Sequence, residues 1–457
     1  MWEWICSWCK RIWDILVVSA RTTEIVLRLF PLLLLTPMST LSPRVSDWTW
    51  AYVTRAVQAL GPAFVKFCQW VATRRDIFPP HVCDRLGTLH DRGTPHEWAF
   101  SQQALTEAFG DYEAKGLTIE DVVGCGSAAQ VYRGTLTEGE RVRPVAVKVL
   151  HPRFEQLVAR DLWLMQTVAE LLHSLPLEAL RLLNLPRATQ TFGSALQLQS
   201  DLRVEAQNLD TFRHNFASSA IFFPQPIWSS PMALVEDLVE DSVPITEYLK
   251  DEDAIEVRRA LAGPLLRAFL KMVFLDNFVH ADLHPGNVLV QTKMVTPEKS
   301  WWSQTEAEPE LKRFIVFLDA GIATSLSPND QRNLIDLFRA VITNSGYEAG
   351  RLMVERAKYE RCTQVEGGTE AFAQGIAGIV SEFHDRRKEG LTLGAVRIGS
   401  LLSRVLDLCR VHGVEIDPAM ASIVISTLVL EGLGRSLEPN LNLIDFAIPF
   451  VMGRGRV

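Results

Sequence analysis

Hydrophobic and polar positions follow two periods along the chain and divide it into helical and strand-rich parts. Helical spacing begins at Gly61-Pro62, with proline at an early helix position, and a stretch of short β-rich runs follows from Leu117 to Leu150. Helical spacing returns over residues 151–215 and again from Pro328 to the end. The pattern predicts an α+β fold without internal repeats, in which a small β-containing lobe precedes a helical lobe.

Shorter elements are expected between these parts. The pattern predicts a strand over Ala233–Val239, a helix over Ile255–Val279, and a β pair formed by Asn287–Val290 and Phe314–Leu318. The polar stretch between the paired strands, Gln291–Lys312, is expected to be an inserted loop, and it carries Trp301-Trp302. These exposed aromatic side chains either contact a membrane or fold back onto the protein.

The first 47 residues are rich in tryptophan and leucine, but charges interrupt their apolar runs. Arg21, Glu24 and Arg28 leave no clean window of the roughly 20 apolar residues that a membrane span needs. A short signal-peptide core at Leu29–Leu35 is not followed by a small-residue cleavage site. The segment therefore either lies on a membrane as an amphipathic helix or packs on the main domain.

Composition narrows the class of protein. Hydrophobic residues make up 47% and charged residues 22%, which is typical of a globular chain with a substantial core. The net charge of −8 does not suggest a broad basic surface, so nucleic acid is not an expected partner. Five of the seven cysteines are isolated, as in reduced proteins, and Cys6 with Cys9 forms half of a zinc site at best.

The most specific chemical signal is His280-Ala281-Asp282-Leu283-His284-Pro285-Gly286-Asn287. An Asp followed five residues later by an Asn, before an apolar strand, is typical of the catalytic loop of kinase-like phosphotransferases. Asp282 would orient an attacking hydroxyl or accept its proton, and Asn287 would hold a magnesium ion. Pro285-Gly286 provides the tight turn that brings both side chains together. The alternative is a turn between helix and strand that Asp and Asn merely cap.

Two further segments fit a nucleotide site in the order that a kinase-like fold requires. Phe314–Leu318 is an apolar run that ends in Asp319-Ala320-Gly321, where such a fold has its second metal carboxylate. Val145-Ala146-Val147-Lys148 matches the strand whose lysine contacts the α- and β-phosphates. The lysine needs a carboxylate partner, and Glu205 on a predicted helix either supplies it or is a solvated helix residue.

A glycine-rich loop precedes the lysine strand. Against G-x-G-x-x-G-x-V, the first two glycines and the valine match, whereas Ala129 replaces the third glycine and restricts φ there. The residues expected to approach the nucleotide are Gly124, Gly126, Ser127, Ala128, Ala129, Gln130 and Val131. Further on, the predicted strand Ala233–Val239 leads into a hinge, at which the backbone of Asp237 and Val239 would contact adenine.

Departures from ordinary protein kinases point to one family. Ala281 stands where protein kinases carry Arg, and no Ala-Pro-Glu follows Asp319. With Lys66-Phe67-Cys68-Gln69 far upstream and Ser127-Ala128-Ala129-Gln130-Val131 in the loop, the chain resembles the UbiB family of aarF-domain (ADCK) atypical kinases. The resemblance covers roughly residues 55–445 and is strongest to the mitochondrial branch called aarF-domain kinase two. In that family, helices carrying K-x-G-Q, matched here by Lys66 and Gln69, fold over the nucleotide site.

Three positions depart from the family pattern. Cys68 replaces the glycine of K-x-G-Q, Gln199-Ser200-Asp201 stands in place of E-x-D, and Asp319-Ala320-Gly321 replaces Asp-Phe-Gly. In the family, the K-x-G-Q and E-x-D parts are thought to restrain protein-kinase activity. The missing glutamate therefore puts that restraint in doubt, and not nucleotide binding.

The resemblance implies a protein-kinase-like two-lobe fold with extra N-terminal helices, family-specific helical insertions and a site for ATP and Mg²⁺. It implies a Mg-dependent ATPase or a small-molecule or lipid phosphotransferase that supports coenzyme Q or lipid homeostasis. The implied setting is the mitochondrial inner membrane, with isoprenoid-like lipids and coenzyme Q biosynthesis proteins as partners. Two alternatives are a catalytically inactive, nucleotide-sensing scaffold and a small-molecule kinase of the aminoglycoside-phosphotransferase kind.

The motifs also divide the chain. The expected parts are an N-terminal segment (1–47), a helical K-x-x-Q extension (48–116), a kinase-like N-lobe (117–239) with a helical insertion at about 151–200, and a helical C-lobe (240–457) with the polar insertion at about 291–312.

Overall fold

The structure is a computed structural model of the 457-residue chain. It describes all residues except 1, 39–41, 75–77, 79, 87–94, 176–184, 218, 296–309, 358, 389–397, 440, 442 and 452–457. Trp301-Trp302 therefore lies outside the described residues, and so do the side chains of Cys6 and Cys9.

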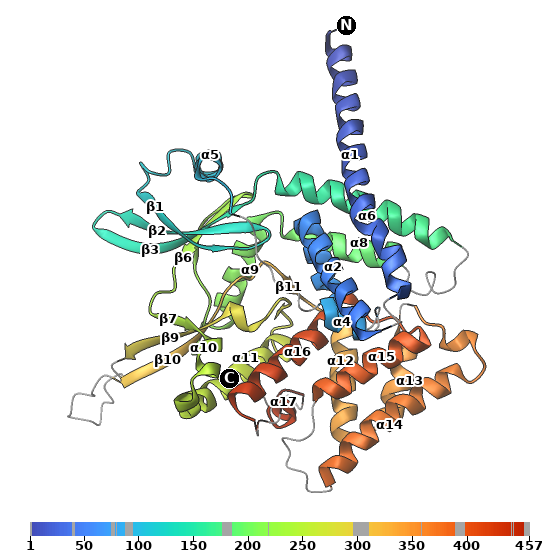
Figure 1. The fold of residues 1–457 in the computed structure, drawn as a ribbon. Helices are drawn as coiled ribbons and strands as arrows, with labels where there is room; N and C mark the ends of the chain where they lie inside the picture. Colours follow the sequence, from blue (N-terminus) through green and yellow to red (C-terminus); the bar gives the residue numbers. More distant parts are fainter. Residues whose placement is uncertain are drawn as a thin grey trace, which may run out of the picture. The chain divides into compact units, whose positions relative to one another are not determined.

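Figure 1 shows the helices and strands of the chain. The chain forms two compact units, each made of segments that alternate along the sequence. Unit 1 comprises Met1–Ser101, Gly124–Gln130 and Leu150–Ser200. Unit 2 comprises Gln102–Val123, Val131–Val149 and Asp201–Val457. The combination of helices and sheets confirms the predicted α+β class.

Unit 1 is helical. Its helices are α1 (Trp2–Met38), α2 (Pro43–Leu60), α3 (Pro62–Thr73), α4 (Pro80–Leu86), α6 (Phe154–Ser174) and α8 (Leu185–Leu198), and α5 (Trp98–Phe109) begins in it. Ser42 caps α2 by accepting a hydrogen bond from the Val45 N–H (3.3 Å). Gly61, at φ +96°, ends α2, and Pro62 starts α3, which confirms the helix predicted from this dipeptide.

A buried ion pair and an aromatic cluster hold unit 1 together. Arg21 of α1 donates two hydrogen bonds to the carboxylate of Asp161 on α6, at 3.0 and 2.8 Å, and a third to the carbonyl of Leu60 at the end of α2. Asp161 is only 2% exposed. Phe67 of α3 packs edge-on against Phe192 of α8, with ring centroids 5.2 Å apart.

Unit 2 contains most of a five-stranded sheet. Across the sheet its strands are β1 (Leu117–Cys125), β2 (Ala129–Glu138), β3 (Arg141–Leu150), β6 (Ala233–Asp237) and β5 (Pro226–Ser229). Strands β3 and β6 are antiparallel, with Ala146 opposite Glu236 and Lys148 opposite Leu234. Helix α9 (Leu202–Asn215) follows the insertion helices and contacts β5 and β6.

A second sheet carries the predicted β pair. Its strand order is β4 (Ile221–Phe222), β10 (Glu310–Phe317), β9 (Val288–Val295) and β7 (Ser242–Pro244), and β8 (Val279–His280) pairs separately with β11 (Ala323–Thr324). The pair β9–β10 is longer than predicted, because its antiparallel ladder continues to Val295 opposite Glu310. Backbone pairing tolerates polar side chains on exposed strands, so the insertion is shorter than the polar stretch 291–312 suggested.

The remaining helices lie between residues 245 and 451. They are α10 (Ile245–Lys250), α11 (Ile255–Phe274), α12 (Pro328–Thr343), α13 (Gly346–Arg356), α14 (Gly368–Lys388), α15 (Ile398–His412), α16 (Pro418–Leu437) and α17 (Leu443–Val451). The prediction that α11 reaches Val279 was wrong. Asn277 adopts the left-handed conformation (φ 49°), which breaks the helix, and Val279 belongs to β8.

Among the described residues, one helical stretch is long and apolar enough to cross a membrane, Ala419–Leu437 in α16. Its mean hydropathy is 1.4, and 56% of it is buried inside the protein. A core helix of a globular protein has the same properties, so this stretch is weak evidence for a span.

Candidate functional site

Lys148 lies near the end of β3, on the sheet face that it shares with Ala146. Val147, which points to the opposite face, is fully buried. Lys148 Nζ donates a hydrogen bond to Glu205 Oε1 on α9, and Glu236 Oε1 on β6 lies 3.6 Å from the same nitrogen. The structure thus brings the expected lysine and glutamate together and adds a second glutamate.

One ammonium group faces three carboxylates in this buried environment. Burial alone lowers the pKa of Lys148, but the charges of Glu205, Glu236 and Asp319 outweigh burial and raise it, so the lysine stays charged. Burial raises the pKa of Glu205 to about 7. Lys148 opposes that shift, whereas Asp319 and Glu236 add to it. Burial also raises the pKa of Glu236.

A tight turn holds Asp282 and Asn287 together. The short 3₁₀ helix η2 (Pro285–Asn287) forms when the His284 ring nitrogen Nδ1 accepts a hydrogen bond from the Gly286 N–H (3.1 Å). Asn287 Nδ2 donates to the carbonyl of Asp282 (3.3 Å). Asn287 is buried and Asp282 is half-buried.

Two hydrogen bonds join this turn to the segment that leads into Asp319. The Leu318 N–H donates to the carbonyl of Asn287 (2.8 Å), and His280 Nε2 donates to the carbonyl of Leu318 (3.1 Å). His280 is fully buried, and burial lowers its pKa, which keeps the imidazole neutral. Asn287 and Asp319 therefore lie on adjacent, mutually bonded segments.

The turn at Asp319 is strained and held from one helix. Asp319 has φ 56°, a left-handed conformation that costs a non-glycine residue about 1–3 kcal/mol. Asn208 Nδ2 on α9 donates to the carbonyl of Ala320 (2.8 Å). A Cβ on Gly321 would lie 3.3 Å from Asp319 Oδ1, so glycine allows this close approach. Helix α9 thus contacts Lys148 through Glu205 and the Asp319 turn through Asn208.

The aspartate of the E-x-D-like segment stabilises the start of α9. Asp201 is the N-cap of the helix, and its side chain accepts a hydrogen bond from the Arg203 N–H (3.0 Å). The Arg203 guanidinium also pairs with it (2.6 Å), which lowers the pKa of Asp201. Asp201 therefore supports the helix that carries Glu205.

The glycine-rich loop is anchored within unit 1 by two histidines. The Gly126 N–H donates to the Ala129 carbonyl (2.9 Å), and the His151 N–H donates to the Ala128 carbonyl (2.9 Å). His151 Nε2 contacts the Gly126 carbonyl (2.8 Å), and His151 Nδ1 contacts His96 Nδ1 (2.8 Å). A carbonyl only accepts, so His151 carries a proton on Nε2.

The other loop residues lie in the adjoining parts of β1 and β2 or between these strands. Gly124 belongs to β1 and Val131 to β2, while Ser127 and Gln130 are buried. Gln130 Oε1 accepts a hydrogen bond from the His96 N–H (2.9 Å). The loop belongs to unit 1 and Lys148 to unit 2, so its part in nucleotide binding stays a prediction from the sequence.

Lys66 and Gln69 are half-buried on α3 in unit 1. Between them, the Cys68 side chain belongs to the core that α2, α3 and α4 share, and burial raises the pKa of its thiol to about 12. Cys68 therefore acts as a small apolar side chain. The role of Lys66 and Gln69 at the nucleotide stays a prediction.

The hinge residues already make hydrogen bonds within the protein. The Asp237 carboxylate accepts from Arg143 (2.6 Å), and the Asp237 N–H donates to the Gln225 carbonyl (3.0 Å). The Val239 carbonyl accepts from the Ser242 hydroxyl (2.8 Å). An adenine contact at this hinge would therefore use the Asp237 carbonyl and the Val239 N–H.

Sequence reasoning missed Glu236, His280, His96 and His151. His280 opens the catalytic-loop motif, so its place in the motif could have indicated a structural role. Glu236 stands among the apolar residues of Ala233–Asp237, and a carboxylate in a buried strand is unusual enough to mark a partner. The two histidines follow no recognisable spacing, because their pairing depends on the tertiary fold.

The oxygen donors fit a magnesium–nucleotide complex. Asn287 and Asp319 supply an amide and a carboxylate oxygen, and Mg²⁺ typically takes few protein ligands and keeps its other positions for phosphate oxygens and water. Because Asn287 Nδ2 donates to Asp282, its Oδ1 is the atom left for a cation. In the described part of the chain, no cluster of three or more His, Cys, Asp or Glu could hold a metal by itself. Metal binding here would depend on the phosphates.

Comparisons with known proteins show the family of the chain. The family model described as "ABC1 atypical kinase-like domain" matches residues 89–350, and "UbiB helical domain" matches residues 387–442. An ABC1 family protein of Schizosaccharomyces pombe, named as mitochondrial, is 32% identical over 89% of this chain and 65% of its own length. Another of Saccharomyces cerevisiae, also named as mitochondrial, is 32% identical over 94% of this chain and 74% of its own. A "probable protein kinase UbiB" of Vibrio atlanticus is 29% identical over 87% of this chain and 69% of its own.

The chain thus spans about two thirds to three quarters of the length of these relatives. A solved complex of Rv3197 with erythromycin from Mycobacterium tuberculosis aligns with 61% of each chain at 18% identity, with a TM-score of 0.43, which is too weak a likeness to support an argument. The first family model alone covers more than half of the chain. The kinase-like domain, the helical domain after it and the relatives at about 30% identity together show that this chain belongs to the ABC1/UbiB family of atypical kinase-like proteins.

Proposed function

We propose that the chain binds ATP with Mg²⁺ at the site around Lys148 and transfers the γ-phosphoryl group to water or to a small or lipid-like hydroxyl. The observation that carries the proposal is the buried Lys148–Glu205 pair, whose helix also holds the turn at Asp319. The names of the relatives, atypical kinase-like and probable protein kinase, support the same reaction class.

Each residue has a distinct part in the proposed reaction. Glu205 keeps the Lys148 ammonium oriented toward the α- and β-phosphates. Asp282 accepts the proton of the attacking hydroxyl. The hydroxyl oxygen forms a bond to the γ-phosphorus, while the bond between the γ-phosphorus and the β,γ-bridging oxygen breaks and ADP leaves. Asn287 and Asp319 would hold the magnesium ion, which supplies positive charge to the phosphates when bound.

ATP turnover and binding by the purified chain test the proposal. Asp282→Asn is expected to lower kcat by about 100-fold or more with little change in ATP affinity, because only proton transfer is lost. Lys148→Met is expected to weaken ATP binding itself. Glu240→Gln, an exposed carboxylate next to the hinge, is the control for charge. Binding without turnover would instead favour the nucleotide-sensing scaffold, and absence of binding in the wild type would refute the proposal.

We further propose a mitochondrial, membrane-associated setting and a lipid-like or isoprenoid-like substrate connected with coenzyme Q. Two relatives are named as mitochondrial. On α1, Leu16, Val26, Leu27 and Phe30 are uncharged and each more than half exposed, whereas Glu24 and Arg28 are less exposed and pair with each other. Such an uncharged, apolar helix face fits the interfacial region of a bilayer.

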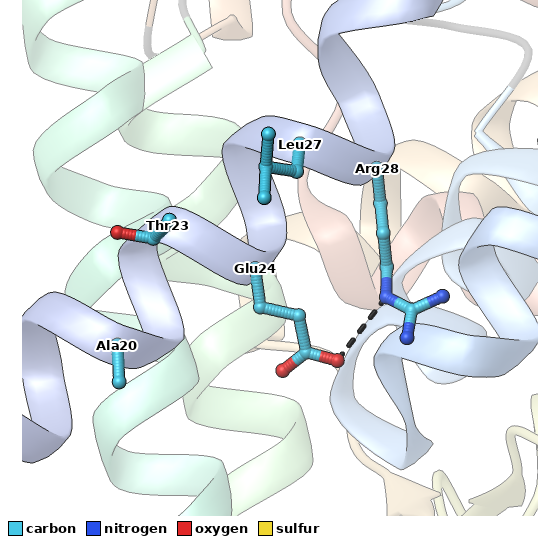
Figure 2. Close-up of a pocket in the computed structure, with 5 residues that line it drawn as sticks. All are labelled: Ala20, Thr23, Glu24, Leu27 and Arg28. Carbon is cyan, nitrogen blue, oxygen red and sulfur yellow. Dashed lines mark hydrogen bonds and ion pairs between the residues drawn. The ribbon is translucent and has the colours of Figure 1, made fainter.

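Several polar side chains between residues 21 and 28 of this helix bond to other groups of the protein. The hydroxyls of Thr22 and Thr23 donate to helix carbonyls four residues back, both at 2.8 Å. Glu24 pairs with Arg28 (3.1 Å) beside a shallow pocket that Leu27 also lines (Figure 2). Because internal bonds satisfy these groups, moving the helix face into lipid would leave few of them unpaired.

Co-sedimentation with vesicles of phosphatidylcholine and phosphatidylglycerol tests the membrane proposal. The double variant Leu27→Glu/Phe30→Glu should stay in the supernatant, because two charges on the apolar face oppose its burial in lipid. Val411→Glu changes an equally exposed apolar residue on α15 and should sediment like the wild type. Equal sedimentation of all three proteins would contradict the role of α1.

A further inference from the structure

Glu236 is a buried carboxylate that the proposed reaction does not need. It follows three fully buried apolar residues of β6, Ala233, Leu234 and Val235, and is itself 4% exposed. Glutamate is almost never this buried unless it is paired. The following residue, Asp237, is paired with a cation, because its carboxylate accepts a hydrogen bond from the Arg143 guanidinium (2.6 Å).

The strand register directs Glu236 toward the lysine. Glu236 is opposite Ala146, and Lys148 is two residues further along the same face of β3. The distance of 3.6 Å from Oε1 to Lys148 Nζ allows an ion pair but is longer than a hydrogen bond. The other oxygen, Oε2, is buried and accepts no hydrogen bond from the part of the chain that the structure describes. Glu236 thus brings negative charge to the lysine without a compensating hydrogen bond.

The negative charge of Glu236 beside Lys148 affects the binding of a nucleotide. Glu205 orients Lys148, and Asp319 is the proposed metal ligand, so each of these two carboxylates has a function. Glu236 is the third carboxylate beside a single ammonium group. A triphosphate that approaches Lys148 must share the lysine with Glu236 and is repelled by it. Over roughly 7 Å at an effective dielectric constant of about 20, one unit charge changes a binding constant more than tenfold.

We propose that Glu236 is an electrostatic restraint on nucleotide binding: its buried carboxylate, 3.6 Å from Lys148, weakens the affinity of the site for the phosphates. The inference rests on the proposed function, since it assumes that phosphates bind at Lys148. The restraint acts more strongly on free ATP than on MgATP, because magnesium neutralises part of the phosphate charge. A merely structural glutamate would produce no such dependence on magnesium.

The test compares dissociation constants of ATP for the wild type and Glu236→Gln by calorimetry, with magnesium and with a chelator. Glutamine keeps the shape of the side chain and removes its charge. We expect ATP to bind about tenfold more tightly to the variant with magnesium, and the gain to be larger without it. Glu240→Gln removes an equal charge from an exposed position and should leave both constants unchanged.

Two further variants complete the design. Glu236→Met fills the site without a polar group and should also bind ATP more tightly, which separates charge from hydrogen bonding. In the Lys148→Met background, Glu236→Gln should keep the part of its effect that comes from direct repulsion between Glu236 and the phosphates.

The outcomes separate this inference from the proposed function. If the wild type binds ATP and Glu236→Gln binds it equally or less tightly, the restraint is refuted and the nucleotide site stands. A gain that is the same with and without magnesium also contradicts an electrostatic origin. If neither protein binds ATP, the nucleotide site itself is refuted, and the restraint with it.

Discussion

Replacement of Glu205 by glutamine tests the charge imbalance around Lys148 without a nucleotide. Glutamine has nearly the same shape as glutamate, and Lys148 would still have Glu236 at 3.6 Å and the charge of Asp319. The ammonium is therefore not left alone, and the change avoids the about 3–5 kcal/mol that breaking a buried pair usually costs. What the variant removes is the ionisation of Glu205 itself.

The size and sign of the effect follow from the pKa of Glu205. In the unfolded chain this carboxyl has its ordinary pKa of 4.5, and burial raises it to about 7 in the folded protein. Between these values the folded state binds more protons than the unfolded state, so wild-type stability falls as the pH rises. The difference in pKa, at about 1.4 kcal/mol per pH unit, amounts to about 3 kcal/mol.

The assay is thermal or urea unfolding of Glu205→Gln and wild type from pH 5 to pH 8. The free energy of unfolding of the variant minus that of the wild type should rise by about 3 kcal/mol over this range, a change of several degrees in the Tm difference. Glu247→Gln, an exposed residue paired with Lys250, should give a flat difference. A flat or falling difference for Glu205→Gln would refute the argument that burial and neighbouring carboxylates dominate this site.

Three further variants and one measurement of thiol reactivity examine the packing of each unit. Gly350→Ala should lower the Tm, because its Cβ would lie 2.7 Å from the backbone of α14, whereas Gly378→Ala, with nothing within 4 Å of its Cβ, should raise stability by about 0.5–1 kcal/mol. Asp161→Asn should destabilise the chain by about 3 kcal/mol, since it removes the buried carboxylate that pairs with Arg21 and leaves the guanidinium only the more exposed Glu24, and an unchanged Tm would contradict this. The Cys68 thiol should not react with a thiol reagent at pH 8 until urea unfolds the protein, because it is buried and its pKa is raised to about 12.

The sequence predicted the class of the fold and most of its elements because period and capping are local properties. Proline and glycine marked the start of α3, and the apolar run before Asp319 is β10. The two wrong predictions concern the ends of elements, which depend on tertiary structure. The end of α11 was missed because Asn277 leaves the helix to start a turn that leads into β8, and the polar ends of β9 and β10 pair only through their backbones.

The site could be predicted only as far as motifs specify it. The motifs in the sequence place Asp282 and Asn287 on one turn and Asp319 on another. In the structure, the Leu318 N–H joins the two turns by donating to the Asn287 carbonyl. Glu236 could not be assigned in this way, since its position beside Lys148 depends on the register between β3 and β6. A shift of that register by one residue would turn Glu236 to the other face of the sheet.

The orientation of helix α1 could not be predicted from the sequence either, and it bears on the proposed membrane contact. In the sequence, Arg21, Glu24 and Arg28 interrupt an apolar helix, and charged residues on a helix usually face water. The structure turns Arg21 inward because Asp161, far away in the sequence, is buried and needs a cation. Once the charged side is occupied in this way, the apolar side, with Leu27 at 69% exposure, becomes the outer face. The exposed apolar face thus follows from one buried ion pair, so a variant that breaks the pair should weaken vesicle binding together with stability, whereas charges placed on the face itself should weaken vesicle binding alone.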